Sequence, residues 1–200
     1  PEIPDEPETP IEPEIPANPE ISTGAGVNYS NDFATVSNWA TIHNYSGNNK
    51  IENGNLVIDA TGNYDAGCAI PVGKYENFTL KLRYKFTEGG WAGVSFGKDV
   101  ATGGNKALLI TYPGNHCELF LNGALTGTYV VGTADADGYI TLNLTVRNNI
   151  VTWNFGGESV SYTVPETTDL TGYIALQAAT CVAYFDYVEI TVIEDEPETP

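Results

Sequence analysis

The chain has 200 residues, with 26 acidic and 8 basic side chains and a formal net charge of −18. So few basic residues exclude the Lys/Arg stripe that nucleic-acid phosphates require, and they argue equally against an anionic membrane surface. The sequence contains no run of 18 apolar residues, so no transmembrane helix is expected. We therefore expect neither nucleic acid nor a membrane among the partners.

Prolines alternate with acidic residues near the N-terminus, and the hexapeptide DEPETP occurs at residues 5–10 and again at 195–200. Closely spaced prolines fix φ and remove backbone donors, so such acidic segments stay extended and solvated. We interpret residues 1–24 and 194–200 as acidic Pro-rich linkers that flank one domain, residues 25–193. Similar linkers on both sides predict a module of a longer multidomain protein, tethered to its neighbours through these linkers. An acidic tail without that role is the alternative.

The linkers carry much of the charge, which leaves 15 acidic against 8 basic side chains between residues 21 and 193. That balance is ordinary for a soluble domain. Together with the linkers it predicts a secreted or cell-surface bacterial protein whose module is monomeric. The three cysteines have neither the number nor the spacing of a disulfide framework or a C-x-x-C metal site. One bridge is conceivable, but buried free thiols are favoured; the cysteines are Cys68, Cys117 and Cys181.

Between the linkers, apolar and polar residues alternate with the period of two that β-strands show. The clearest run is residues 76–86, ENFTLKLRYKF, which is followed by runs at 139–147, 150–155, 159–164 and 181–192. Asn-Gly, Gly-Gly and Asn-Asn pairs separate the runs, and these pairs suit tight turns because they tolerate positive φ. About a dozen short strands without helical periodicity predict an all-β, two-sheet antiparallel β-sandwich or jelly roll.

Several short segments resemble one known group of proteins. The order of these segments is similar to that in concanavalin A-like jelly-roll modules of bacterial polysaccharide-degrading systems, which include levan-binding modules. The resemblance covers nearly all of residues 27–193 and implies a jelly-roll fold and a carbohydrate ligand. It also implies that Asp186 is a structural residue that hydrogen-bonds a turn. The segments are NDFATVSNWATI (31–42), IENGNLVID (51–59), WAGVSFG (91–97) and GYIALQAATCVAYFDYVEI (172–190).

Catalytic motifs are not evident in the sequence. Glycoside hydrolysis uses two facing carboxyl groups, but the E-x-D-x-x-E strand motif of jelly-roll glucanases is missing. The two histidines, His43 and His116, are far apart in the chain, and neither a Ser-His-Asp arrangement nor a phosphate-binding Gly-rich loop is present. We therefore predict that the chain is not an enzyme.

A sugar site combines aromatic faces, which stack on the ring, with polar groups that bind hydroxyls. The candidates lie beside glycines or in polar loops, and most have an ordinary alternative. Trp91 could open a buried strand, and residues 112–116 could form a plain Pro-Gly turn. The predicted carbohydrate-binding residues are Trp91, Tyr112, Asn115, His116, Tyr64, Asp65, Lys98 and Gln177.

No cofactor or metal is predicted, although a structural Ca²⁺ held by Asp32 and Asp186 is a weaker alternative because Ca²⁺ needs only clustered oxygens. The predicted function is a non-catalytic carbohydrate-binding module that attaches its protein to a neutral polysaccharide. Starch or another α-glucan, or a fructan, is favoured, with recognition of chain ends as one mode. The alternatives are an adhesion domain for a host protein or glycoprotein, a pure spacer, and a sandwich-fold glycoside hydrolase.

Overall fold

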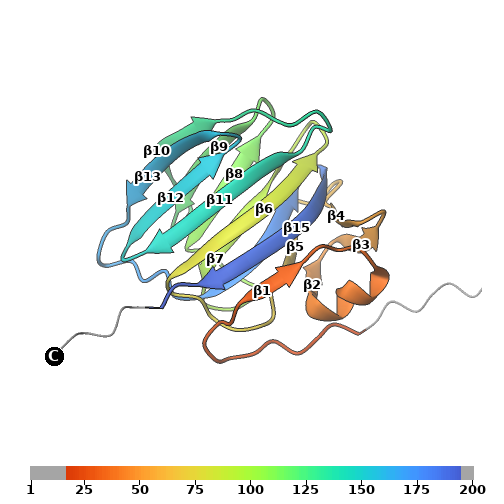
Figure 1. The fold of residues 1–200 in the computed structure, drawn as a ribbon, viewed down its shortest axis with the longest axis horizontal. Helices are drawn as coiled ribbons and strands as arrows, with labels where there is room; N and C mark the ends of the chain where they lie inside the picture. Colours follow the sequence, from red (N-terminus) through yellow and green to blue (C-terminus); the bar gives the residue numbers. More distant parts are fainter. Residues whose placement is uncertain (1–16, 195–200) are drawn as a thin grey trace, which may run out of the picture.

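The computed structural model describes residues 17–194, in which two antiparallel β-sheets lie face to face (Figure 1). This confirms the predicted all-β, two-sheet sandwich. Residues 36–41 form a short 3₁₀ helix, η1 (Val36–Thr41). Within residues 17–194, no helix has the length and apolar character that crossing a bilayer would require.

One sheet has eight strands, of which β6, β11, β12, β13 and β15 run across the front of Figure 1. Its order is β13 (Glu158–Thr163), β12 (Ile150–Phe155), β11 (Ile140–Arg147), β6 (Phe78–Phe86), β15 (Val182–Val192), β4 (Asn55–Asp59) and β3 (Asn48–Glu52), and β1 (Tyr29–Asn31) also pairs with β15. The second sheet has seven strands in the order β10 (Ala124–Val131), β9 (His116–Leu121), β8 (Ala107–Tyr112), β7 (Trp91–Lys98), β14 (Tyr173–Ala179), β5 (Ala66–Ala69) and β2 (His43–Ser46).

The core lies between the sheets and follows from the alternation in the sequence. On β6, Phe78, Leu80, Leu82 and Tyr84 are buried, whereas the residues between them point outward. Removing such side chains from water is the main stabilising contribution to a sandwich of this kind. The three cysteines are buried and free, which confirms the prediction of unpaired thiols.

Asp186 takes a different role from the one the resemblance implied. It lies where the register of β15 against β6 shifts, and its Oδ2 accepts a hydrogen bond of 2.6 Å from Arg83 on β6. Asp186 therefore bonds a neighbouring strand and not a turn. Asp32 accepts hydrogen bonds from the backbone of Ala34 and the side chain of Asn38. Among residues 17–194, no group of three or more His, Cys, Asp or Glu side chains gathers into a metal-binding arrangement.

The seven-stranded sheet is covered on part of the side that faces away from the core. A second, smaller apolar cluster lies there, formed by Ala69, Ala101, Tyr173 and Ala175, with Ile21 and Tyr45 packed against it. Two segments supply this cover: the loop 99–105 and residues 18–24, which composition assigns to the linker.

Candidate functional site

The candidate site lies on the outer face of the seven-stranded sheet, meaning the side turned away from the eight-stranded sheet. Residues that face each other in neighbouring strands point to the same side of a sheet. The register therefore places one row of residues across this face, which we call the central row. The central row contains Gly67, Gln177, Gly93, Ile110, Glu118 and Tyr129, on β5, β14, β7, β8, β9 and β10.

Gln177 is the centre of a hydrogen-bonded group that we call the polar network. Only 1% of Gln177 is exposed, and its Nε2 donates to Tyr45 Oη at 2.7 Å and to Asp65 Oδ1 at 2.9 Å. Its Oε1 accepts a bond of 3.2 Å from Asn105 Nδ2, and Asn105 Oδ1 accepts a bond of 2.5 Å from Lys98 Nζ. The buried amide thus satisfies both of its polar ends, as a buried polar group must.

A β-bulge turns Lys98 toward this network. Ser95 faces Ala175, but Lys98 faces Tyr173, so β7 contains one residue more than β14 in this interval. Gly97 takes a φ of 65° there, a left-handed conformation that glycine adopts without a Cβ penalty. Without the extra residue, Lys98 would point into the core.

Burial sets the ionisation of two members of the network. It lowers the pKa of Lys98 to about 8, although the charge of Asp65 acts in the opposite direction. The Tyr45 ring lies 5.5 Å from Lys98 Nζ. Burial, followed by the charge of Asp65, raises the pKa of Tyr45 well above its usual value, so its hydroxyl stays protonated. Below pH 8 Lys98 therefore still carries its proton, and the network presents one cation, the Tyr45 phenol and two amides beside Asp65.

A second group, which we call the β9 cluster, comprises Tyr112, His116, Glu118 and Tyr129. His116 stacks on Tyr129 with ring centres 4.4 Å apart and meets Tyr112 edge-on at 6.2 Å. His116 Nε2 lies 3.5 Å from Glu118 Oε2 and has no hydrogen-bond partner among residues 17–194. The Glu118 side chain is only 11% exposed. Burial, together with the charge of Glu118, raises the pKa of Tyr112. The cluster thus combines a carboxylate, an imidazole and two phenols.

Six of the eight predicted site residues fall into three sets. Asp65, Lys98 and Gln177 meet in the polar network, and Tyr112 and His116 meet in the β9 cluster. Half-buried Trp91 lies on the same outer face, opposite Ala179 on β14. The next residue, Ala92, faces Thr111 on β8. The same antiparallel register therefore places Trp91 opposite Tyr112.

The structure does not bring Tyr64 or Asn115 into either group. Tyr64 is 83% exposed in the loop that follows β4. Asn115 has a φ of 59° in the β8–β9 turn, and its carbonyl accepts a hydrogen bond from Gly132. A pocket of about 150 Å³ beside Asn115 is lined in part by β6 residues of the other sheet. Asn115 therefore shapes a turn away from the outer face.

Sequence reasoning missed four residues of these groups: Tyr45, Asn105, Glu118 and Tyr129. The sequence could have indicated Glu118, because alternation in HCELFL (116–121) places it on the same face as His116. Tyr45 and Asn105 reach Gln177 across 132 and 72 positions of the chain, so no local pattern indicates them.

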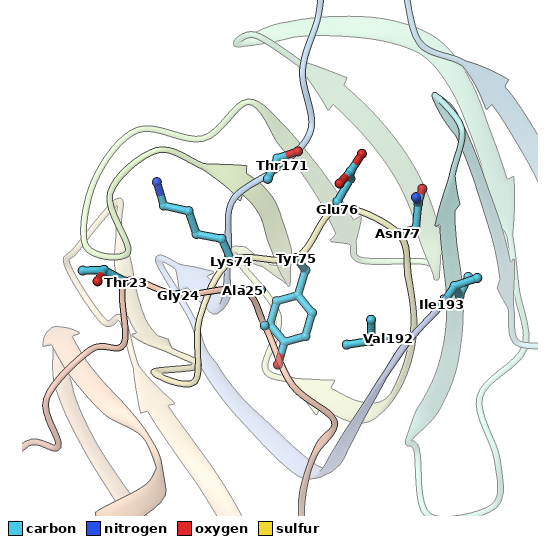
Figure 2. A pocket seen from close by; sticks show the side chains of 11 residues that line it. Thr23, Gly24, Ala25, Lys74, Tyr75, Glu76, Asn77, Thr171, Val192 and Ile193 are labelled. Atoms are coloured by element: carbon cyan, nitrogen blue, oxygen red, sulfur yellow. The ribbon is translucent and has the colours of Figure 1, made fainter. Parts of the chain in front are cut away.

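A pocket of about 380 Å³ lies elsewhere, where residues 23–26, 74–77 and 192–193 meet (Figure 2). Its central aromatic side chain, Tyr75, is only 2% exposed, and its hydroxyl donates to the carbonyl of Val27. A Cβ at Gly26 would lie 2.7 Å from the Tyr75 ring. Tyr75 therefore packs the seam between the two ends of the domain and offers no free face for a sugar.

Sequence comparison places the domain in a family. The family model for a 3-keto-alpha-glucoside-1,2-lyase-like domain matches residues 29–191. The chain belongs to this family. No curated protein is significantly similar to it in sequence.

Solved structures share the fold of this lyase-like domain at low identity. A Bacillus subtilis protein of unknown function with a galectin-like fold is 14% identical with a TM-score of 0.66, and the match covers 83% of this chain and 96% of that one. The carbohydrate-binding module CBM66 from Bacillus subtilis is 13% identical, with a TM-score of 0.58 and coverage of 76% and 95%. The catalytic domain of an endo-1,3-beta-glucanase (laminarinase) from Thermotoga petrophila is 13% identical, with a TM-score of 0.59 and coverage of 84% and 97%. The domain thus has the jelly-roll fold of these structures.

The family match corrects the prediction that the chain is not an enzyme. That prediction depended on a missing E-x-D-x-x-E motif and on scattered histidines. The motif belongs to hydrolysis by paired carboxylates, whereas the matching family is described as lyase-like. A lyase eliminates a leaving group and needs a different set of groups. The missing hydrolase motif therefore does not exclude lyase chemistry.

Proposed function

We propose that this lyase-like domain binds a neutral α-glucoside along the central row and carries out elimination chemistry at the β9 cluster. The observation that carries the proposal is the central row itself, which aligns the polar network and the β9 cluster on one face. Gln177 and Glu118 are three strands apart in it, or roughly 14 Å at the usual strand spacing. That span suits a short oligosaccharide better than a single ring.

The residues of the outer face provide what sugar recognition requires. Asp65, Tyr45 and Asn105 can bind hydroxyls, and Gln177 holds all three in place. Tyr129 is 53% exposed and braced by the His116 ring, so it offers a face on which a sugar ring can stack. Asp65 and Glu118 accept hydrogen bonds from hydroxyls but repel carboxylates. A neutral glycan is therefore favoured over a polyanionic one such as pectate.

The family name supports a specific reaction. In a 3-keto-glucoside, the ketone at C3 makes the hydrogen on C2 acidic. A base removes that proton, the C1–O bond breaks, and the leaving oxygen takes up a proton as a C1–C2 double bond forms. The β9 cluster offers Glu118 as the base, with His116 and the Tyr112 hydroxyl as proton donors. The "alpha-glucoside" of the family name favours α-glucans over fructans, including levan.

The covered end of the outer face favours recognition of chain ends. Residues 18–24 and the loop 99–105 close the face beside the polar network, and the β9 cluster lies toward the open strand edge at β10. A bound glycan would thus place its terminal unit near Gln177. The acidic Pro-rich termini support the further proposal of a monomeric module in a secreted or surface protein, where tandem copies would add avidity.

Two assays on the full 200-residue chain test this function. Native gels containing starch, levan, inulin or pectin measure binding, and retardation by starch alone is expected. Incubation with a 3-keto-α-glucoside, followed by mass spectrometry, measures elimination through the released aglycone and the unsaturated sugar. The matched variants are Glu118→Gln on the outer face and Tyr64→Ala in the exposed loop. Unchanged mobility in every gel together with an intact 3-keto substrate would refute the proposal.

A further inference from the structure

Residues 18–22 form a strap that is fastened to the edge strand β2. The Asn18 side chain bonds the Asn44 backbone twice: Nδ2 donates to its carbonyl at 2.7 Å, and Oδ1 accepts from its amide at 3.1 Å. The Pro19 carbonyl lies 2.9 Å from His43 Nδ1 and accepts its hydrogen. The Ser22 amide donates to the Pro71 carbonyl at 2.8 Å. These bonds hold the strap at a fixed place beside the outer face.

The strap inserts one apolar side chain, that of Ile21, into the outer face. Ile21 packs against the small cluster of Ala69, Ala101, Tyr173 and Ala175, and Tyr45 packs against the same cluster. Ala69 and Ala175 face each other on adjacent strands, one row away from Gln177. Ile21 therefore occupies a slot that has alanines as its floor and tyrosines among its walls.

The chemistry of this slot matches that of a sugar ring. A ring presents an apolar C–H face, which suits the alanine floor and tyrosine faces, and a hydroxyl edge, which needs donors and acceptors. Tyr45 belongs to both the slot and the polar network, so the slot adjoins Asp65 and Gln177. Ile21 is the apolar residue in a strap whose other members are Asn18, Pro19, Glu20 and Ser22. Ile21 does not belong to the core between the two sheets.

We propose that Ile21 fills a glycosyl subsite of the outer face, and that the strap thereby restricts binding to chain ends. This inference rests on the proposed function, since it assumes a glycan on the central row. With the strap in place, the slot is blocked and the glycan must end beside Gln177. With Ile21 removed, the chain can continue through the slot, and a glycan without ends becomes a ligand.

The test compares a linear and a cyclic α-glucan, maltoheptaose and γ-cyclodextrin, by calorimetric titration into the full chain. The native protein is expected to bind maltoheptaose and to bind γ-cyclodextrin at least tenfold more weakly. Ile21→Gly should remove most of that difference by gaining affinity for the cyclic glucan. Asn18→Ala, which releases the strap but keeps Ile21, should shift the ratio in the same direction by a smaller factor. The matched control is Val27→Gly, an exposed valine outside the slot.

The outcomes separate the two proposals. If the native chain binds maltoheptaose but neither strap variant gains affinity for γ-cyclodextrin, the subsite is wrong and the proposed function stands. If the native chain binds both glucans equally, the strap does not restrict binding to chain ends, and the inference is also wrong. If no variant binds either glucan, both proposals fail for α-glucans. If Ile21→Gly does not fold, the affinity of Asn18→Ala for γ-cyclodextrin decides whether the subsite proposal holds.

Discussion

The outer faces of the two sheets differ sharply. On the eight-stranded sheet, β6 alternates buried apolar residues with outward Thr79, Lys81, Arg83 and Lys85, as expected of a solvated face. On the seven-stranded sheet, every residue of β14 is buried, although no third sheet is present within residues 17–194 to cover it. Its outward side is covered by the polar network, the loop 99–105 and the strap. This cover of loops and buried polar side chains is the reason why we place the candidate site on this face.

The same contrast appears in how polar groups are used. Arg83 reaches Asp135 and Asp186 at 2.6 Å each on the solvated face, where water competes with both pairs. Gln177 makes its bonds in a place that water does not reach. Substitutions on the two faces should thus have different consequences, and four experiments test that difference.

The largest effect is expected from Glu118→Gln. The amide keeps the size of the side chain but cannot take up a proton, so elimination of a 3-keto-α-glucoside should slow by about 10²- to 10⁴-fold. The melting temperature should change little. The matched control is Glu189→Gln on the eight-stranded sheet, where exposed Glu189 faces Lys81. Equal rates for both variants would show that the β9 cluster carries no chemistry.

Gln177→Leu should destabilise the fold and weaken binding. Leucine has a similar size but leaves Tyr45, Asp65 and Asn105 without their shared partner. Orphaned buried polar groups cost about 1–3 kcal/mol in unfolding free energy. Urea denaturation measures that loss. Exposed Asn143 on β11 offers the control, because Asn143→Leu should change stability by less than about 0.5 kcal/mol. A Gln177→Leu protein as stable as the native one would mean that the network contributes nothing to folding.

Sequence patterns predicted the solvated sheet better than the covered one. Strict alternation located β6, β11, β12, β13 and β15 to within two residues at each end. Strand β5, with the sequence AGCA, has no alternation because all four residues are buried. Strand β14, YIALQAA, reads as a continuous apolar run for the same reason. Period-two patterns exist only where one face of a strand meets water.

The candidate site could be predicted only where its members are close in sequence. Tyr112 and His116 belong to one hairpin, so their contact follows from the turn between them. Asp65 and Gln177 are 112 positions apart, and only the sheet topology joins them. The role of Ile21 was not predictable at all, because its proline-rich and acidic surroundings read as linker.

The pH dependence of stability should reveal the covered lysine. Burial lowers the pKa of Lys98 to about 8, below its usual value of 10.5. Between these two values the unfolded chain holds a proton that the folded chain has released, so this group raises the free energy of unfolding as pH increases from about 8 to 10.5. Lys98→Met removes that contribution. Urea denaturation at pH 8, 9 and 10 should therefore show a more positive slope for the native protein than for the variant. Equal slopes for the native protein and Lys98→Met would mean that Lys98 is in contact with water in the folded state.

The smallest effect is expected from Asp186→Asn. Arg83 loses one charged partner but keeps Asp135, and both side chains of the lost pair are partly exposed. Pairs of this kind contribute less than about 1 kcal/mol, and salt screens them further. The change in unfolding free energy should therefore be below that value in dilute buffer and smaller still in 1 M NaCl. Activity on the outer face of the seven-stranded sheet should stay unchanged. A loss of several kcal/mol, or a loss of activity, would mean that the eight-stranded face is coupled to the site and that the contrast between the two faces does not hold.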